Sequence, residues 1–422
     1  MNKLSLSFLC FIYFFTINYY SLSQNLELKK IKNENISFFS MFQLESNNLE
    51  HEFFNTILFG GNINQEIKNN WINSGSQTNK IHSNISHGIS YRFSNPKTSF
   101  SITISDVNHL NAIFDDDLLK LVFQGNYHYQ NQTLDISNTI FRGERFQGIN
   151  FSNFHKIKPN IKIETGISYL HGNQHVSYLV NEGTFYTAPN GTSLDINFDL
   201  NSFRTNISDF SIINTNGNGA AINFGTYLNN YNNETFFFNV RDLGFIKWHN
   251  QSIVGNSDTN INITGLEIHS FDNLMNYTDS IEEINLEKIY TEKNNGFNTF
   301  TKSNITLGYV KNVNNKYITN YGFSIIYKWH PYEFTKNISF SLFQKGLSES
   351  GFDPMIKFYS NFKYKGIILN TGISHGGYLD NYKIYFILSN KNQNISIGTY
   401  NIEGVFNNWK SLSTFLNLTT YF

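Results

Sequence analysis

Two histidines, His171 and His175, have a spacing that can hold zinc from one face of a helix. Gly172 lies between them, and the flanking residues alternate between apolar and polar as they do in a strand. On a strand the two side chains would lie ~13 Å apart, because each residue rises ~3.3 Å. We therefore expect histidines that face solvent or an interior, and no metal site.

Other residues that could do chemistry also lack the context they need. Asp115, Asp116 and Asp117 could bind calcium, but the spaced ligands and the glycine of a calcium loop are missing, and helix capping explains the three acids. Gly217–Gly219 is not followed by the residues of a phosphate-binding loop. The sequence predicts no catalytic serine and no cofactor. We therefore expect a protein that is not an enzyme.

The elements that would carry any site are strands with one apolar and one polar face. Ser193–Arg204 alternates almost without exception, and Ile85–Phe93, Phe100–Ser105 and Ile161–Tyr169 repeat the pattern. Such strands separate an apolar phase from a wet one. If the apolar faces contact lipid, polar side chains project inward, and the candidates are Arg92, Lys162, Glu164, Asp195 and Asp199. A wet interior of mixed charge fits either a channel or a structural core of ion pairs.

Both ends of the chain carry export features. Lys3, the apolar stretch Leu4–Phe15 and the small residues before Gln24 predict a signal peptide over residues 1–23, which would remove the single cysteine, Cys10. In the last strand, Leu416 and Leu418 share a face with the terminal Phe422, which resembles the signal read by outer-membrane assembly machinery. The formal net charge of -1 and the scattered basic residues exclude a nucleic-acid surface.

These features together predict an all-β fold, a single transmembrane antiparallel β-barrel of about 14 strands, within about two either way, with short helices in long loops. We expect the barrel over residues 81–422. Residues 24–80 either begin the barrel or fold inside it as a plug. The expected location is the outer membrane, where the partners are lipid, the assembly machinery and a surface or periplasmic protein.

Turns and loops should alternate between the two barrel ends, short turns on the periplasmic side and long loops outside. The long connections are predicted at Val107–Gln132, Thr205–Gly217 and His249–Asn298. Helices are expected at Leu118–Gln124, between Asp115 and Gly125, and at Asp279–Lys293. The alternation loses its parity between Trp329 and Met355. The tryptophans at strand ends predict interfacial aromatic belts, and they are Trp248, Trp329 and Trp409.

One stretch is familiar. Asp242–Trp248 closes a strand in a manner that resembles a family of outer-membrane barrels from Bacteroidota, catalogued as a domain of unknown function. Leu118–Gly125, Gly166–Gly172 and Gly372–Phe406 extend the similarity, which runs from about residue 81 to the C-terminus. The resemblance implies fold and location but no functional residues. Barrels related in kind include fatty-acid-transporter-like proteins and the PorV and PorP/SprF components linked to type IX secretion and gliding.

Three functions remain open at this stage. The leading hypothesis is a non-enzymatic channel or transporter-like barrel for small apolar or amphipathic solutes. The first alternative is a scaffold barrel, associated with type IX secretion or gliding, that binds protein partners. The second is an outer-membrane enzyme. A channel predicts an open interior, a scaffold predicts a filled one, and an enzyme predicts histidine and acid side chains that converge near one rim.

Overall fold

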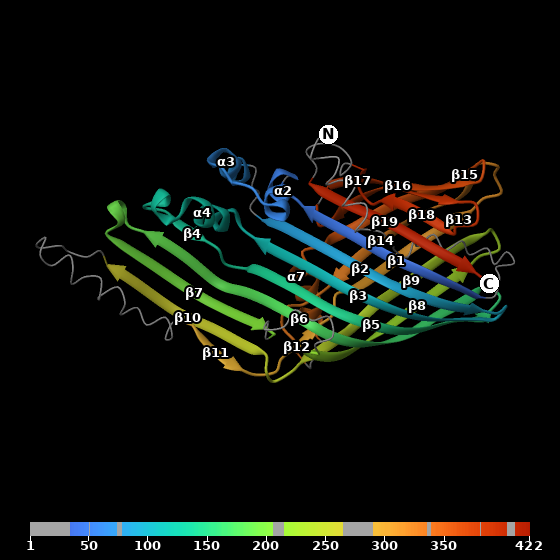
Figure 1. Ribbon diagram of the computed structural model, residues 1–422, viewed down its shortest axis with the longest axis horizontal. Helices are drawn as coiled ribbons and strands as arrows, with labels where there is room; N and C mark the ends of the chain where they lie inside the picture. Colours follow the sequence, from blue (N-terminus) through green and yellow to red (C-terminus); the bar gives the residue numbers. More distant parts are fainter. Residues whose placement is uncertain are drawn as a thin grey trace, which may run out of the picture.

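The computed structural model describes residues 34–49, 51–73, 78–205, 215–264, 290–335, 339–379, 381–402 and 410–422. Within these residues, fourteen antiparallel strands pair with their neighbours to form a closed ring, so the predicted barrel of about 14 strands is confirmed (Figure 1). The ring strands in spatial order are β1 (Glu34–Ser46), β2 (Asn79–Ser94), β3 (Thr98–Phe114), β5 (Thr139–Lys158), β6 (Ile161–Thr187), β8 (Gly217–Asn229), β9 (Glu234–Trp248), β13 (Ser303–Asn312), β14 (Ile318–Trp329), β15 (Asp353–Tyr364), β16 (Ile367–Gly377), β17 (Asn381–Asn390), β18 (Ile395–Thr399) and β19 (Ser411–Tyr421).

Strand β1 closes the ring. Phe38 pairs with Leu418 of β19 on one side and with Ile89 of β2 on the other. Within the described residues every ring strand pairs with a neighbour on each side, which a barrel in lipid requires because no water is present to satisfy free backbone groups. Residues 34–46, within the segment for which the sequence left two readings, therefore lie in the wall and not inside the barrel.

The two faces of the ring strands differ as the alternation predicts. On β6, Ile167 is 64% exposed on the outside, whereas Glu164 on the opposite face is 2% exposed. On β3, Ile104 is 56% exposed and Ser101 is 3% exposed. A wall that exposes its apolar side chains and buries its polar ones is the reverse of a soluble domain, and it fits a lipid environment.

Short turns gather at one end of the barrel, which we call the turn end; the C-terminus lies there (Figure 1). In the β2–β3 turn, Oδ1 of Asn95 accepts hydrogen bonds from the backbone N–H groups of Lys97 and Thr98, at 3.0 and 2.7 Å. Such local acceptors are the reason that asparagine favours tight turns. The opposite end carries the long connections, and we call it the loop end.

At the loop end, part of the wall continues as a sheet beyond the ring (Figure 1). The first part of β6 pairs with β8 up to Gly172, and the second part, from Val176 onward, pairs with β7 (Ser193–Arg204). We call this extension the platform; besides the end of β6, its strands are β4 (Thr133–Asp135), β7, β10 (Ile253–Thr264) and β11 (Thr291–Asn294).

The platform corrects one expectation. β7 lies outside the closed ring, so Asp195 and Asp199 do not project into the barrel. Asp199 accepts a hydrogen bond from Asn181 at 3.1 Å, and Asp195 accepts one from Asn262. Alternation reports that a strand has two different faces, but it does not report whether the strand belongs to the membrane wall.

Helices occupy the loop end. They are α2 (His51–Phe59), α3 (Gln65–Asn73) and α4 (Asp116–Gln124), with 3-10 turns η1 (Asn126–Tyr129) and η2 (Pro189–Gly191), whereas α7 (Phe340–Glu349) belongs to the connection between β14 and β15. α2, α3 and α4 pack in one apolar cluster with Phe42 and Phe114. No helix in the described ranges is long and apolar enough to cross a membrane.

Helix α4 confirms the expected helix, with Asp115 as the residue before it and Gly125 after it at a φ of 75°. The second expected helix, Asp279–Lys293, lies outside the described residues up to position 289. Its last residues instead form strand β11. The alternation of short turns and long loops loses its parity after Trp329 because α7 and its flanking segments form the connection between β14 and β15.

The tryptophans differ from the expected aromatic belts. Trp248 is 0% exposed and Trp329 is 5% exposed, so both are interior residues and the prediction is wrong for them. Nε1 of Trp248 donates a hydrogen bond to Oγ1 of Thr299 at 2.9 Å. A strand-end position cannot distinguish a tryptophan at the lipid interface from one that packs inward. Trp409 lies outside the described residues.

Candidate functional site

The segment from His330 to Phe352, which connects β14 to β15, enters the barrel; we call it the plug segment and describe its residues 330–335 and 339–352. Its Tyr332 packs against Ile140 of β5 and Leu179 of β6, and the Tyr332 hydroxyl donates a hydrogen bond to the backbone oxygen of Asn201 at 3.1 Å. A Cβ on Gly351 would lie 3.0 Å from Cδ1 of Ile113 of β3. β3, β5 and β6 are not neighbours of β14 or β15 in the ring, so the plug segment crosses the interior.

Four side chains meet where the plug segment reaches the wall, and we call them the histidine cluster: His109, Glu144, His175 and His330. The first three are directly opposite one another on adjacent strands, since His109 of β3 pairs with Glu144 of β5, which pairs with His175 of β6. His330 comes from the plug segment. All four side chains are 0–1% exposed.

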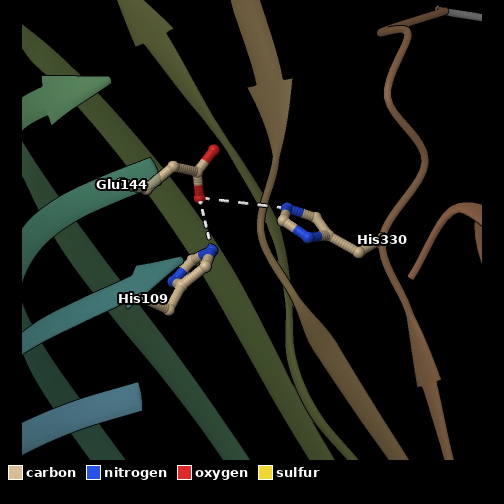
Figure 2. Close-up of side chains that lie close together, drawn as sticks. All are labelled: His109, Glu144 and His330. Atoms are coloured by element: carbon tan, nitrogen blue, oxygen red, sulfur yellow. Dashed lines mark ion pairs between the residues drawn. The ribbon is translucent and has the colours of Figure 1, made fainter. Parts of the chain in front are cut away.

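The carboxylate of Glu144 is the centre of the histidine cluster. Its Oε2 lies 3.0 Å from Nε2 of His109 and 3.8 Å from Nε2 of His330, and both rings point toward this oxygen (Figure 2). Its Oε1 lies 2.9 Å from Nδ1 of His175. The other nitrogen of His175, Nε2, lies 2.8 Å from Oγ of Ser177. One acid thus contacts three imidazoles in a site closed to solvent.

The histidine cluster continues into the plug segment through Arg142. Its Nη1 donates to the backbone oxygen of His330 at 3.2 Å, and its guanidinium carbon lies 5.2 Å from the ring centroid of Tyr332. The backbone N–H of Tyr332 donates to Oε2 of Glu349 at 2.6 Å. Burial raises the pKa of Glu349 above its ordinary value. The end of α7 is therefore tied to the same network.

A second group of buried charges fills the interior nearby. Lys383 of β17 lies 2.8 Å from Glu45 of β1, and the two side chains are 4% and 1% exposed. Beside this group, Lys80 pairs with Asp353, the first residue of β15, whose side chain is 43% exposed. Nζ of Lys328 lies 4.5 Å from the ring of Phe352. These contacts match the structural core of ion pairs that the sequence left open as an alternative to a channel.

The three remaining polar candidates from the sequence do lie inside the ring. Glu164 contacts Arg241 at 2.8 Å and accepts a hydrogen bond from the hydroxyl of Tyr227 at 3.0 Å. The Arg92 guanidinium lies 5.9 Å from the ring centroid of Phe154. Lys162 is half-buried on the same face of β6 as Glu164. None of these residues reaches the histidine cluster.

The expected assembly signal lies on the last ring strand. Leu418 is 40% exposed and Phe422 is 59% exposed, while Leu416 is half-buried. Leu418 pairs with Phe38 of β1 and with Ile395 of β18, so this face continues the exposed apolar wall. Recognition by an assembly machinery stays a prediction.

The sequence missed the histidine cluster for an identifiable reason. Val107–Gln132 was interpreted as a connection, but β3 continues to Phe114 and brings His109 into the wall. An extra residue in β6 between Gly172 and Gln174 then shifts the pairing, so His175 faces Glu144. His171 lies elsewhere, with Nε2 3.3 Å from Oγ1 of Thr215. The signal that was available is the alternation between the two strand faces, which continues along β3 beyond Val107 and reaches His109.

Ser374 lies in a sequence pattern that is found in serine hydrolases, but it occupies a regular strand. Gly372 to Gly376 has the spacing Gly-x-Ser-x-Gly around Ser374. In serine hydrolases this pattern forms a sharp turn from a strand into a helix. Here it lies within β16, and Ser374 pairs with Lys383 of β17 in a regular ladder. This part of the chain therefore does not form a nucleophile elbow.

The closed antiparallel ring, the apolar outer face and the filled polar interior define an outer-membrane type of β-barrel. The chain belongs to the family of unknown function DUF5723, whose profile matches residues 29–373. This confirms the resemblance to a barrel family of unknown function. A comparison with curated proteins finds no match.

Three solved structures show some similarity to this chain. The translocator domain of the autotransporter NalP from Neisseria meningitidis is 7% identical, with 95% of this chain and 92% of that chain covered and a TM-score of 0.36. The CymD monoaromatic hydrocarbon channel is 8% identical, with 97% and 95% covered and a TM-score of 0.34. The outer membrane protease OmpT from Escherichia coli is 8% identical, with 94% and 98% covered and a TM-score of 0.19. The fold assignment rests on the strand pairing of this chain itself.

Proposed function

We propose that this protein is a non-enzymatic outer-membrane scaffold, a closed barrel that anchors the platform at the cell surface for a protein partner. The observation that carries this proposal is the plug segment, which crosses the interior and meets β5 on the far wall, where His330 contacts Glu144 and Tyr332 packs against Ile140. In this orientation the short turns face the periplasm and the loop end faces outward. Export by an N-terminal signal peptide belongs to the same proposal.

The energetics favour a closed barrel. The plug segment partners buried polar groups of the wall, since Arg142 donates to the backbone oxygen of His330 and Glu144 lies 3.8 Å from the His330 ring, and leaving a buried charged group without its partner costs roughly 1–3 kcal/mol or more. An open aqueous pore would require the plug segment to leave and its contacts to be lost. The platform, in contrast, extends beyond the ring without lining it, and so it is available to a partner.

A liposome-swelling assay tests this proposal. Proteoliposomes that contain the full chain are diluted into isotonic solutions of sugars of increasing size. A scaffold gives the slow swelling of empty liposomes for every sugar. Rapid swelling with the smallest sugars, from protein whose heat-modifiable gel mobility shows a folded barrel, would contradict the proposal and restore the channel hypothesis.

One observation favours the second candidate, transport of a small amphipathic solute. The platform carries a hollow of about 460 Å³, and the lining residues are Tyr178, Phe198, Leu200, Arg204, Ser257, Tyr290 and Glu292. At its edge Arg204 contacts Glu292 at 2.8 Å. An apolar lining with a few charged groups suits an amphipathic ligand.

Binding of a medium-chain fatty acid to the protein in nanodiscs tests this second candidate. Leu200→Trp fills the hollow and should abolish saturable binding, whereas Tyr231→Trp, at a fully exposed position in the β8–β9 turn, should not. No saturable binding to the wild type, or equal binding to both variants, would remove the transport hypothesis.

A further inference from the structure

The histidine cluster has the composition and the spacing of a metal site. Ligand atoms of His109, Glu144 and His330 all lie within 4.8 Å of one another, and all three residues are buried. Two imidazoles and a carboxylate are ligands typical of Zn²⁺. Tetrahedral zinc with bonds of ~2.0–2.1 Å places neighbouring ligand atoms about 3.3 Å apart. The observed separations from Oε2 of Glu144, 3.0 and 3.8 Å, lie on either side of this value.

Hydrogen bonding gives an independent indication. Nε2 of His109, one of the candidate ligand atoms, is fully buried and lies 3.0 Å from Oε2 of Glu144, yet within the described residues these two atoms do not have the geometry of a hydrogen bond. The atoms are close enough to bond, so their directions are wrong for it. Buried polar atoms without a partner are rare and need an explanation, such as an ion that they surround.

We propose that His109, Glu144 and His330 bind one Zn²⁺ ion, which fastens the plug segment to the barrel wall. The ligand atoms are Nε2 of His109, Oε2 of Glu144 and Nε2 of His330, and water takes the fourth position. His330 exchanges its contact with the backbone oxygen of Phe300, at 3.1 Å, for the metal bond. This proposal is independent of the scaffold and transport functions, because either is compatible with a fastened plug.

His175 acts as a positioning residue in this site. Its Nδ1 contacts Oε1 of Glu144, the oxygen that does not bind the metal, and its Nε2 contacts Ser177. A histidine or carboxylate behind a ligand fixes the ligand's orientation, and its removal weakens metal affinity by roughly 10–100-fold. The apolar shell on this side comes from Trp248 and Phe297, whose ring centroids lie 5.3 and 5.2 Å from that of His175.

Two cations near the site oppose a divalent ion, and they make the proposal testable. Arg142 already contacts His330 and Tyr332. Lys302 lies within electrostatic range of His109 and Glu144, and its buried Nζ has no hydrogen-bond partner in the described part of the chain. Removal of this charge as Lys302→Met should tighten zinc binding by about tenfold. A purely structural polar network would not respond to zinc at all.

The test uses the full chain, refolded in detergent without a polyhistidine tag, stripped with EDTA and dialysed against Zn²⁺. We expect one equivalent by elemental analysis, and loss of this equivalent in His109→Ala and in His330→Ala. The control is His155→Ala, an exposed histidine on the same strand as Glu144, which should keep it. Lys302→Met should lower the zinc dissociation constant measured by calorimetry.

Cobalt substitution of the wild type gives a readout that needs no variant to fold. Tetrahedral Co²⁺ bound by nitrogen and oxygen ligands absorbs visible light strongly, and the addition of Zn²⁺ should remove the absorption. Folded wild-type protein that binds no zinc would overturn the proposal. Zinc that is retained in folded His109→Ala and His330→Ala would overturn it as well.

Discussion

Glu144 of β5 lies 3.0 Å from His109 of the neighbouring wall strand and 3.8 Å from His330 of the plug segment, so one buried carboxylate joins the wall to the segment that crosses the barrel interior. Tyr332 of the plug segment also donates to the backbone oxygen of Asn201 in β7, which links the plug segment to the platform. Single substitutions in these parts should therefore change the stability or the conductance of the barrel.

Removal of the Glu144 carboxylate should destabilise the barrel strongly. Glu144→Ala leaves three buried imidazoles and Arg142 without their acid, which costs roughly 3–5 kcal/mol of unfolding free energy. Glu144→Gln keeps the shape and loses the charge, so it should cost less. Urea unfolding of the protein in lipid vesicles measures both. Equal stability of Glu144→Ala and the wild type would show that the histidine cluster is not part of the fold's stability.

The buried pair Glu45–Lys383 should behave differently from a surface pair. Lys383→Met leaves the carboxylate of Glu45 buried without its partner and should cost roughly 3–5 kcal/mol. The matched control is the exposed pair Glu333–Lys345, 3.0 Å apart, where Glu333→Gln should cost less than about 1 kcal/mol. The double variant Glu45→Gln/Lys383→Met should recover most of the loss. Similar losses at both pairs would contradict the burial argument.

Close packing between α7 and the wall should keep the barrel shut. A Cβ on Gly346 would collide with Nε1 of Trp329, so Gly346→Val must push the helix away from β14. Electrical recordings should then show intermittent openings that the wild type lacks. Gln344→Val, on the exposed face of the same helix, should record as the wild type does. Silent recordings from folded Gly346→Val would mean that the helix does not close the interior.

The raised pKa of Glu349 predicts a dependence on pH with a definite sign. Since burial raises this pKa, the folded state binds a proton more readily than the unfolded chain, and stability falls as pH rises from the ordinary carboxyl pKa through the raised value. Glu349→Gln is always neutral and its side-chain oxygen still accepts from the N–H of Tyr332. Its thermal midpoint should therefore exceed that of the wild type at neutral pH, and the difference should shrink toward about pH 4. A difference that stays constant with pH would refute this assignment.

The cost of placing a charge on the apolar outer face should depend on the depth of the position in the bilayer. Ile167→Arg places a cation on the lipid-facing side of β6 and should cost about 2–4 kcal/mol if it lies near the centre of the bilayer. Val122→Arg, on α4 at the loop end and 65% exposed, should be nearly neutral. Unfolding in lipid vesicles measures both costs. A neutral Ile167→Arg would place that face in water.

Much of the fold could be predicted because lipid imposes a simple rule on each strand. The alternation at Ile161–Tyr169 puts Lys162 and Glu164 on one face, on which Glu164 is 2% exposed, and Asp115 with Gly125 marks α4. The same rule failed at Ser193–Arg204, because a strand of the platform has two faces too. The histidine cluster was out of reach, since it depends on cross-strand register and on a connection, residues 330–352, that folds back through the ring. Register and long-range contacts are set by pairing between distant segments, which a single sequence does not display.

Conductance of the full-length protein in planar lipid bilayers tests most directly whether the plug segment closes the barrel. The informative deletion lies within the plug segment, with residues 331–351 replaced by a short glycine-serine linker, because it leaves every wall strand in place, β1 included. We predict no steady conductance from the wild type and steady channels from the deletion variant. Steady conductance from folded wild-type protein would contradict a closed barrel.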